Sequence, residues 1–222
     1  MLYMIHACKG REWYVNRFLI PSMLSQGISR DNIKVWMDYE QKGNLTSTME
    51  SFAECGKTKG TTWHLQDDVI LSKDFYERAE LQDQEKVVCG FCSEAFGPNI
   101  NKIGPVRPYE MWWSFPCIQI PNYLAGECSE WFYECASKDD KKCYSERVGK
   151  GKSDDWFWRR FMILRYPHFE VINLNPNLVD HIDYLIGGSV INPARSKDTR
   201  SAWFRDIDLV AKLESELKDE NL

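Results

Sequence analysis

The sequence predicts an α/β protein with a mainly parallel sheet and helices on both faces. Three observations lead to this prediction. Apolar runs of strand length alternate with segments of helical periodicity in the first half of the chain, which is the order that a parallel sheet requires. The chain has 222 residues, of which 43% are hydrophobic and 27% charged, as expected for a folded globular protein. No apolar run approaches the length of a transmembrane helix.

The first half supplies four predicted strands with helices between them. The strands are short apolar or β-branched runs at 2–8, 33–39, 61–66 and 86–92. A helix at 12–26 has apolar residues at helical spacing, and a second lies in GNLTSTMESFAEC, where Thr46 or Ser47 is the expected cap. A third helix is expected to begin near Lys73, with Ser72 as its cap.

The second half begins after Gly97 with a long loop rich in Pro and Gly, which leads to a short strand in CIQIP. The remaining predicted elements are helices at 122–136 and 153–166, a strand at 169–174 and an amphipathic terminal helix at 206–218. We find no internal repeat and expect one domain that spans residues 1–222.

Charge and cysteine content narrow the expected setting. The net charge is −5, with −6 on residues 1–140 and +4 on residues 141–212, which favours a phosphate-bearing ligand over general coating of nucleic acid. MLYMIHAC reads as a strand rather than a signal peptide, so we expect a cytoplasmic protein, in the host cytoplasm if a phage encodes it. Most of the eight cysteines are then expected to be thiols. Cys89 and Cys92 are expected to be core residues, with a redox pair as the alternative.

An acidic pair follows the third predicted strand in TTWHLQDDVILSKDF. An ionised carboxylate is costly to bury unless it is paired or holds a metal. Ligands of parallel sheets bind beyond the carboxyl ends of the strands, where Asp67 and Asp68 are expected to lie. Because successive strand residues point to opposite sides, we expect one carboxylate to face Mg²⁺ or Mn²⁺ and the other to face a sugar or water. The alternative, that the pair only begins a turn, stays open.

This stretch resembles the metal-binding strand end of GT-A glycosyltransferases, which carry Asp-x-Asp or a variant such as Glu-Asp-Asp. Here the variant is Gln66-Asp67-Asp68. The resemblance implies a GT-A-like, Rossmann-like fold with a nucleotide-binding half at 1–97, an acceptor and metal-completing half at 98–205 and a terminal helix at 206–222. It also implies transfer of a hexosyl or pentosyl group from a nucleotide sugar, foremost a UDP-sugar, to an acceptor hydroxyl.

The resemblance assigns donor-binding residues along the first half. In HACKGREWYV it places Ala7 and Cys8 beside the nucleotide base and Arg11 on the pyrophosphate. Asp38, in IKVWMDY, would accept hydrogen bonds from uracil or ribose, and Trp112 would stack on the donor sugar or the acceptor. The alternatives are that Arg11 is a solvated first-turn residue and that Asp38 starts a turn.

The resemblance also assigns the metal and the catalytic base. In NPNLVDHIDYLIGGS, His181 would complete a Mn²⁺ or Mg²⁺ site with Asp67 and Asp68. In GKSDDWFWRRFM, Asp155, or else Asp154, would deprotonate the acceptor hydroxyl, which implies inversion at the anomeric carbon. The alternative is that both residues only stabilise the first turn of a helix capped by Ser153.

The acceptor is the least defined part of this hypothesis. The short chain and its HLQDDV element resemble compact phage and bacterial enzymes associated with TET/JBP oxygenases, which glycosylate hydroxymethylated pyrimidines in DNA. A basic later half suits DNA, with Arg159, Arg160, Arg195, Lys197, Arg200 and Arg205. A glycan or protein acceptor is the alternative. So is a metal-dependent nucleotidyltransferase, although CKGRE is a poor match to a Gly-rich phosphate loop.

Overall fold

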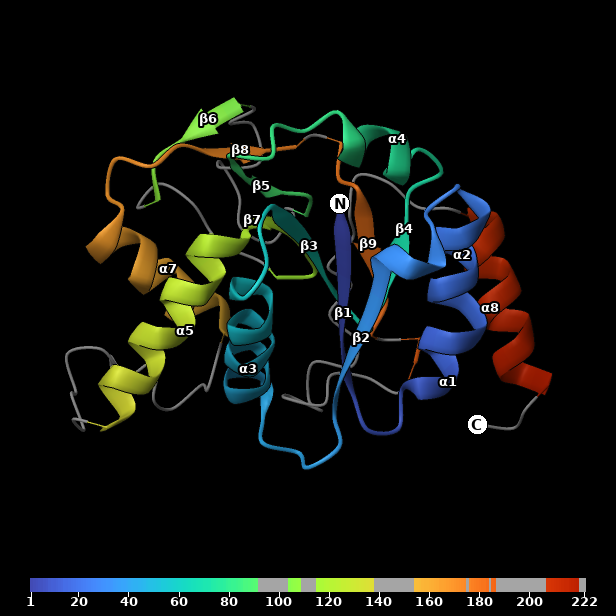
Figure 1. Cartoon of the computed structure of the whole chain (residues 1–222). Helices are drawn as coiled ribbons and strands as arrows, with labels where there is room; N and C mark the ends of the chain where they lie inside the picture. The colour runs from blue at the N-terminus through green and yellow to red at the C-terminus, as the bar shows by residue number, and fades with distance from the viewer. Residues whose placement is uncertain are drawn as a thin grey trace.

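The computed structural model describes residues 1–91, 104–108, 115–137, 154–174, 176–183, 185–186 and 207–219. In these residues the chain forms an α/β structure around a seven-stranded sheet (Figure 1). The fold class predicted from the sequence is thereby confirmed at this level. Several residues of interest lie outside the described residues, namely Cys92, Trp112, Ser153, Arg195, Lys197, Arg200 and Arg205.

The central sheet has the strand order β2-β1-β3-β7-β5-β8-β6. The strands are β1 (Leu2–Cys8), β2 (Ile33–Asp38), β3 (Thr61–Gln66), β5 (Val87–Cys89), β6 (Gly104–Val106), β7 (Cys117–Pro121) and β8 (Val171–Asn173). The pairings show that β2, β1, β3, β5 and β8 run in one direction, while β7 and β6 run against them. The sheet is therefore mostly parallel, with one antiparallel strand in its middle.

A second, two-stranded sheet pairs β4 (Val69–Leu71) with β9 (Val179–His181) in antiparallel fashion. β4 begins three residues after β3 ends, so the small sheet continues from the central one. Its partner β9 comes from far along the chain. This pairing brings residues of the two halves of the sequence together beside the acidic pair.

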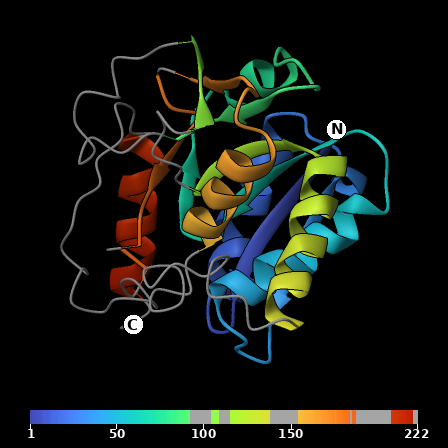
Figure 2. The same ribbon diagram turned by 90° about the vertical axis from the view of Figure 1, so that its left-hand side faces the viewer.

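Helices cover both faces of the sheet (Figures 1 and 2). One side carries α1 (Glu12–Tyr14), which continues through a π-helical turn at Val15–Leu19 into α2 (Ile20–Ser25), together with α4 (Phe75–Glu80) and α8 (Ile207–Asp219). The other side carries α3 (Asn44–Gly56), α5 (Asn122–Ser137) and α7 (Asp154–Arg165). Figure 2 views the molecule from the side of α5 and α7, with the sheet behind them.

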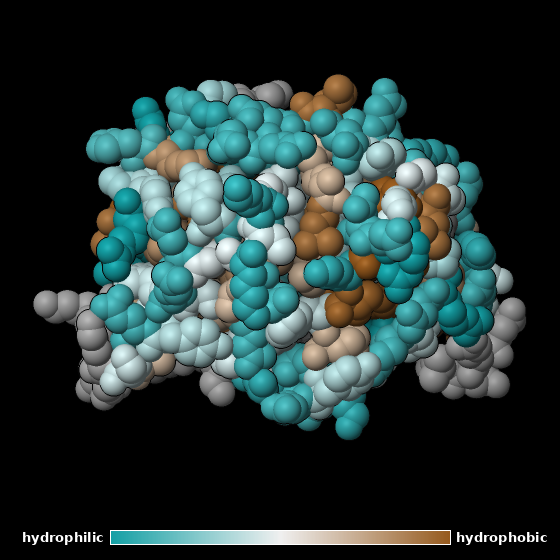
Figure 3. Space-filling view, in the orientation of Figure 1, coloured by the Kyte–Doolittle hydropathy of each residue, from teal (hydrophilic) through white to brown (hydrophobic). Residues whose placement is uncertain are grey.

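Each face of the sheet has its own hydrophobic core. Trp63 and Leu65 of β3 are fully buried with the α1–α2 segment, whereas Phe52 of α3 packs edge-on against His64 on the opposite face. This alternation is what a strand covered on both sides requires. Burying each large apolar side chain contributes ~1.5–3 kcal/mol. The face in Figure 3 is mainly hydrophilic, with apolar residues gathered around β2 and α2.

Long elements match the sequence predictions, and element ends and short strands differ from them. Strands 2–8 and 61–66 are confirmed as predicted. The predicted caps of α3 are wrong, because the helix begins at Asn44 and encloses both Thr46 and Ser47. Asp38 bends the chain there by accepting bonds from the amides of Lys42 and Gly43, at 2.9 and 3.0 Å. 

The helix after Ser72 likewise starts later than predicted. α4 begins at Phe75, because residues 69–71 are taken up by β4 and Phe75 donates its amide to the Ser72 carbonyl at 3.1 Å.

Cys8, Cys55, Cys89, Cys117 and Cys128 are thiols, and Cys135 is disulfide-bonded. None of the described helices is long and apolar enough to cross a membrane.

Candidate active site

The carboxyl ends of β1, β2 and β3 meet at one edge of the sheet. Cys8 lies opposite Asp38 in the β1–β2 register, and His6 lies opposite Gln66 in the β1–β3 register. The residues that follow these strands therefore share that edge. This is where ligands bind in open α/β sheets, and it is where Asp67 and Asp68 are placed.

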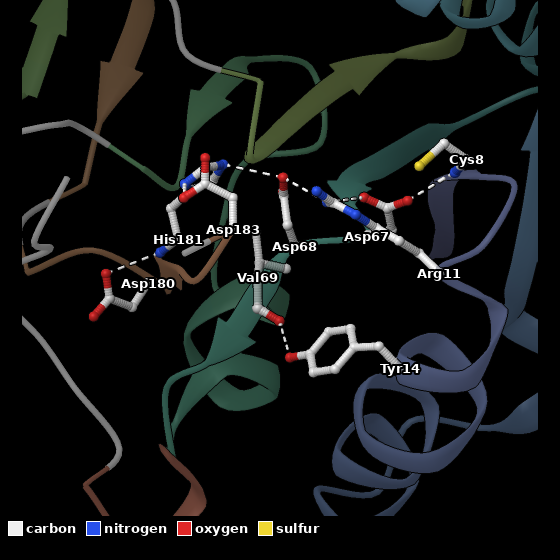
Figure 4. A network of polar contacts seen from close by, with 9 residues as sticks. All are labelled: Cys8, Arg11, Tyr14, Asp67, Asp68, Val69, Asp180, His181 and Asp183. Atoms are coloured by element: carbon white, nitrogen blue, oxygen red, sulfur yellow. Dashed lines mark hydrogen bonds and ion pairs between the residues drawn. The ribbon is translucent and has the colours of Figure 1, made fainter. Parts of the chain in front are cut away.

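Both carboxylates converge on a single arginine (Figure 4). Arg11 Nη1 donates to Asp67 Oδ1 and to Asp68 Oδ2, each at 2.9 Å. Asp67 Oδ2 also accepts the backbone amide of Cys8 at 2.7 Å. The expectation that the two carboxylates face opposite sides is wrong, because they lie in the turn between β3 and β4, where strand alternation does not apply. The alternative of a solvated Arg11 is also wrong, since only 5% of Arg11 is exposed.

His181 approaches the acidic pair from the distant β9 strand. It lies opposite Val69 in the β4–β9 register, and the next amide, that of Ile182, donates to the Asp68 carbonyl at 2.8 Å. This pairing places His181 Nε2 at 3.2 Å from Asp68 Oδ2. His181 is the last residue of β9. The predicted meeting of His181 with Asp68 is observed.

A third carboxylate stands on the other side of the imidazole. Asp183 Oδ1 lies 3.3 Å from His181 Nδ1, and 5% of Asp183 is exposed. The sequence analysis missed this residue, although the Asp-His-Ile-Asp spacing places it two positions beyond His181. The charges thus alternate from Asp183 through His181, Asp68 and Arg11 to Asp67, as Figure 4 shows.

Burial and neighbouring charges separate the pKa values of the two acids. Burial and the nearby charge of Asp68 raise the pKa of Asp67 to about 6. Burial alone would also raise the pKa of Asp68, but the charges and hydrogen bonds of His181 and Arg11 outweigh it and lower that pKa. Burial opposes protonation of His181, but Asp68 and Asp183 raise its pKa to about 10. Without a metal, these surroundings favour the imidazolium form of His181 beside the Asp68 carboxylate.

The geometry around Asp68 fits a divalent cation. Asp68 Oδ1 is buried and has no hydrogen-bond partner among the described residues. Neighbouring ligands of an octahedral ion with bonds near 2.1 Å are about 3 Å apart. The 3.2 Å between Asp68 Oδ2 and His181 Nε2 is close to this spacing. A carboxylate oxygen with a neutral imidazole suits Mn²⁺.

The protein ligands present make only part of a coordination shell. Among the described residues, no group of three His, Cys, Asp or Glu side chains is arranged to hold a metal ion. Asp67 is bonded to Arg11 and to the Cys8 amide, and it contributes to the site only through these bonds. Asp68 and His181 would thus hold the ion, and the remaining ligands would be water or oxygens of a bound substrate, as is usual for ions that act on phosphates.

The other predicted donor-binding residues stand at the same edge. Ala7 is 5% exposed near the end of β1, and Asp38 ends β2 beside Cys8. Both carboxylate oxygens of Asp38 accept backbone amides of the following loop, so the turn-starting interpretation is observed. Each oxygen keeps a second lone pair. Contact of Ala7, Cys8 and Asp38 with a nucleotide stays a prediction, as does that of Trp112, which lies outside the described residues.

Asp154 joins the start of α7 to the start of α3. Its Oδ1 accepts the side-chain amide of Asn44 at 2.8 Å, and its Oδ2 accepts the hydroxyl of Thr48 at 3.0 Å. Asp154 is 4% exposed, and burial raises its pKa to about 6. α3 begins just beyond the carboxyl end of β2, so the start of α7 lies near the same carboxyl edge of the sheet as the acidic pair.

Asp155 differs from its neighbour in exposure. It is half-buried, and its Oδ1 accepts the backbone amide of Trp156 at 2.7 Å. Because Asp154 is enclosed against α3, Asp155 is better placed to reach an external hydroxyl. The order of preference predicted from the sequence, Asp155 before Asp154, agrees with this difference, while the role itself stays a prediction.

Tyr14 is a second residue that the sequence analysis missed. Its hydroxyl donates to the carbonyl of Val69 at 2.6 Å, and the side chain is 1% exposed. It thereby ties the α1 segment to β4, directly after the acidic pair. An aromatic residue on the apolar face of a helix predicts only a core position, so no sequence signal distinguished this role.

The comparisons with known proteins identify no family for this chain. No protein-family model matches it, and no curated protein sequence matches it. The functional conclusion therefore rests on the geometry at the carboxyl edge of the sheet and on the motifs that predicted it.

Proposed function

We propose that the protein is a metal-dependent glycosyltransferase that moves a sugar from a nucleotide diphosphate, foremost UDP, to an acceptor hydroxyl. The observation that carries the proposal is the contact of Asp68, in the acidic pair, with His181 at 3.2 Å, across a sequence distance of more than a hundred residues. Buried oxygen and imidazole ligands at the carboxyl edge of an α/β sheet suit a cation that binds a diphosphate.

The proposed transfer breaks the bond between the anomeric carbon and the β-phosphate oxygen, which leaves with the bonding electron pair. A bond forms between the acceptor oxygen and the anomeric carbon on the opposite face, which gives inversion. Asp155 takes the hydroxyl proton as general base. When bound, Mn²⁺ or Mg²⁺ supplies positive charge for the leaving diphosphate. Asp68 and His181 would hold that ion, and Arg11, whose Nη1 lies 2.9 Å from Asp68 Oδ2, would contact the phosphates.

For the acceptor, we propose a hydroxymethylated pyrimidine in DNA, with a glycan or protein hydroxyl as the alternative. The described part of α7 supports a charged acceptor: Arg159 lies with its guanidinium 5.4 Å from the centre of the Trp156 ring, next to Asp155. An aromatic ring and cations beside a general base suit a base that has been flipped out of a duplex.

The test is a product assay with UDP-sugars and Mn²⁺, on acceptors that include hydroxymethylated DNA. We expect release of UDP that EDTA abolishes and Mn²⁺ restores, and loss of this release in Asp68→Asn. Asp31→Asn, at an exposed position, is the matched control and should retain activity. Release of pyrophosphate from a nucleoside triphosphate would decide for the nucleotidyltransferase instead. Unchanged UDP release in Asp68→Asn would contradict the proposed metal site.

A further inference from the structure

We infer that Arg11 is a built-in counter-ion of the acidic pair, which a divalent cation displaces and which then binds the diphosphate of the donor. The inference rests on the proposed function, because it concerns how the same site is filled. It assigns Arg11 two successive positions: on the carboxylates before the metal binds, and on the phosphates afterwards.

The contacts of Arg11 support the first position. One nitrogen, Nη1, lies 2.9 Å from an oxygen of each carboxylate, and the side chain is 6% exposed. A positive group between two acids occupies the place where a cation shared by both would gain most. The same oxygen, Asp68 Oδ2, also lies 3.2 Å from His181 Nε2. An ion that binds Asp68 through Oδ2, beside His181, therefore competes with Arg11 for this atom.

The metal ion and the Arg11 guanidinium also repel each other, even if there is space for both beside Asp68. A divalent ion on Asp68 Oδ2 would lie within a few ångströms of the guanidinium, in surroundings where charges are weakly screened because they are buried. The carboxylates that now balance Arg11 would then be balanced by the metal. Displacement of Arg11 from Asp68 follows from this repulsion.

The position of Arg11 in the chain supports the second role. It lies in the turn between β1 and α1, where its amide donates to the Cys8 carbonyl at 3.2 Å. This turn is at the carboxyl edge, beside the predicted base-binding residues Ala7 and Cys8. A guanidinium offers five donors in a planar fork that matches phosphate oxygens.

The test measures two affinities in each of three proteins by calorimetry: Mn²⁺ alone, and UDP in the presence of saturating Mn²⁺. Arg11→Gln removes the charge but keeps a polar side chain of similar length. Arg17→Gln is the control, because Arg17 is a half-exposed arginine of the adjacent helical segment. In Arg11→Gln we expect Mn²⁺ to bind on the order of tenfold more tightly and UDP on the order of tenfold more weakly, within the usual range of coupling between sites. Both affinities should stay at the wild-type values in Arg17→Gln.

A purely structural ion pair gives a different pattern. If Arg11 only stabilises the fold, Arg11→Gln weakens the binding of both ligands. That result overturns the inference but not the proposal of a metal site at Asp68 and His181. Equal Mn²⁺ affinity in Arg11→Gln and wild type overturns it as well. If the wild-type protein binds neither Mn²⁺ nor UDP, the proposed function fails first, and the inference fails with it.

A measurement on the wild-type protein covers the case in which Arg11→Gln does not fold. The guanidinium NMR signals of an arginine locked between two carboxylates show slow rotation, and added Mg²⁺ should release this restraint for Arg11 when UDP is absent. Signals that stay locked at saturating Mg²⁺ would show that the metal and Arg11 occupy the acids together, contrary to the inference.

Discussion

At the scale of residues, the protein buries a row of charged side chains that the stability of the fold does not require. The side chains of Asp67, Asp68, Arg11, His181 and Asp183 are each between 6% and 13% exposed. Desolvating such ions costs several kcal/mol each, and apolar replacements are often neutral or stabilising. Their mutual contacts offset the desolvation cost only while the whole row is intact. Such an arrangement favours a functional role for these residues.

The contact of Asp68 with His181 should appear as energetic coupling. Asp68→Asn and His181→Gln each remove one charge and strand its partner, so each single change should lower the free energy of unfolding by about 3–5 kcal/mol at neutral pH without metal. The double variant should be less destabilised than the sum, by about 1–3 kcal/mol, because both changes remove the same Asp68–His181 contact. Urea unfolding of the four proteins measures this. Additive effects within about 0.5 kcal/mol would mean that the two side chains do not interact.

Asp154 should make stability depend on pH. Its pKa is raised from 3.8 to about 6 in the folded protein, so the folded state binds the proton more tightly than the unfolded one. Protonation of Asp154 therefore stabilises the folded state fully below pH 4. This stabilisation, of up to about 3 kcal/mol, is lost as pH rises through 6. Asp154→Asn keeps an uncharged side chain of the same shape between Asn44 and Thr48.

The measurement for Asp154 compares urea unfolding of wild type and Asp154→Asn between pH 4 and 7. Relative to wild type, the variant should gain stability as pH rises through 6. Asp31→Asn, which is exposed, controls for the general effect of the substitution. A stability difference that is constant across this range, or that grows as pH falls, would contradict the assigned shift.

At the scale of elements, the close contact of α3 with α5 depends on two glycines. A Cβ on Gly56 would lie 2.6 Å from the Gly126 Cα, and a Cβ on Gly126 would lie 3.0 Å from the Gly56 Cα. Both atoms met are backbone, so no side chain can turn away. Gly56→Ala and Gly126→Ala should therefore each lower the free energy of unfolding by roughly 1–3 kcal/mol, as is typical of overpacking. The loss should be larger for Gly56→Ala.

Thermal and urea unfolding test this contact, with Glu130→Ala on the exposed part of α5 as the control. That control should be near neutral, because alanine favours helix and no packing is changed. If Gly56→Ala proved as stable as wild type, the two helices would be farther apart than described.

The elements that the sequence predicted well are those with a long local pattern. β1 and β3 are seven and six residues long and mostly buried on both faces, and their bounds are as predicted. β4, β6 and β9 have three residues each and were not predicted. Three residues contain too little of a period, and these strands exist because of partners far along the chain. The start of α3 was misplaced for a related reason, since Asp38 and Asp154 decide it from outside the helix.

The candidate site shows the same difference between features that a local motif predicts and features that depend on long-range contacts. The acidic pair and His181 carried local motifs and were predicted. The convergence of both acids on Arg11 was not, because it depends on the turn between β3 and β4, and on Arg11 folding back from the turn after β1. Tyr14 and Asp183 were missed because their roles follow from strand pairing and helix docking rather than from residue type.

At the scale of the whole molecule, the site exists only when both halves of the chain are assembled. β7 lies between β3 and β5 in the sheet, although it follows both in the sequence. His181 reaches Asp68 only through the pairing of β9 with β4. The proposed metal ligands are therefore brought together by long-range strand pairing, so a cation bound there should stabilise the entire fold by mass action.

The central claim is that Asp68 and His181 together hold a divalent cation at this edge. Calorimetric titration of Mn²⁺ into the wild-type protein, Asp68→Asn and His181→Gln tests it most directly, with circular dichroism to confirm that each variant is folded. The account predicts one Mn²⁺ per wild-type chain and an affinity at least roughly tenfold weaker in each variant, because each loses a direct ligand. Equal Mn²⁺ affinity in all three folded proteins would contradict it.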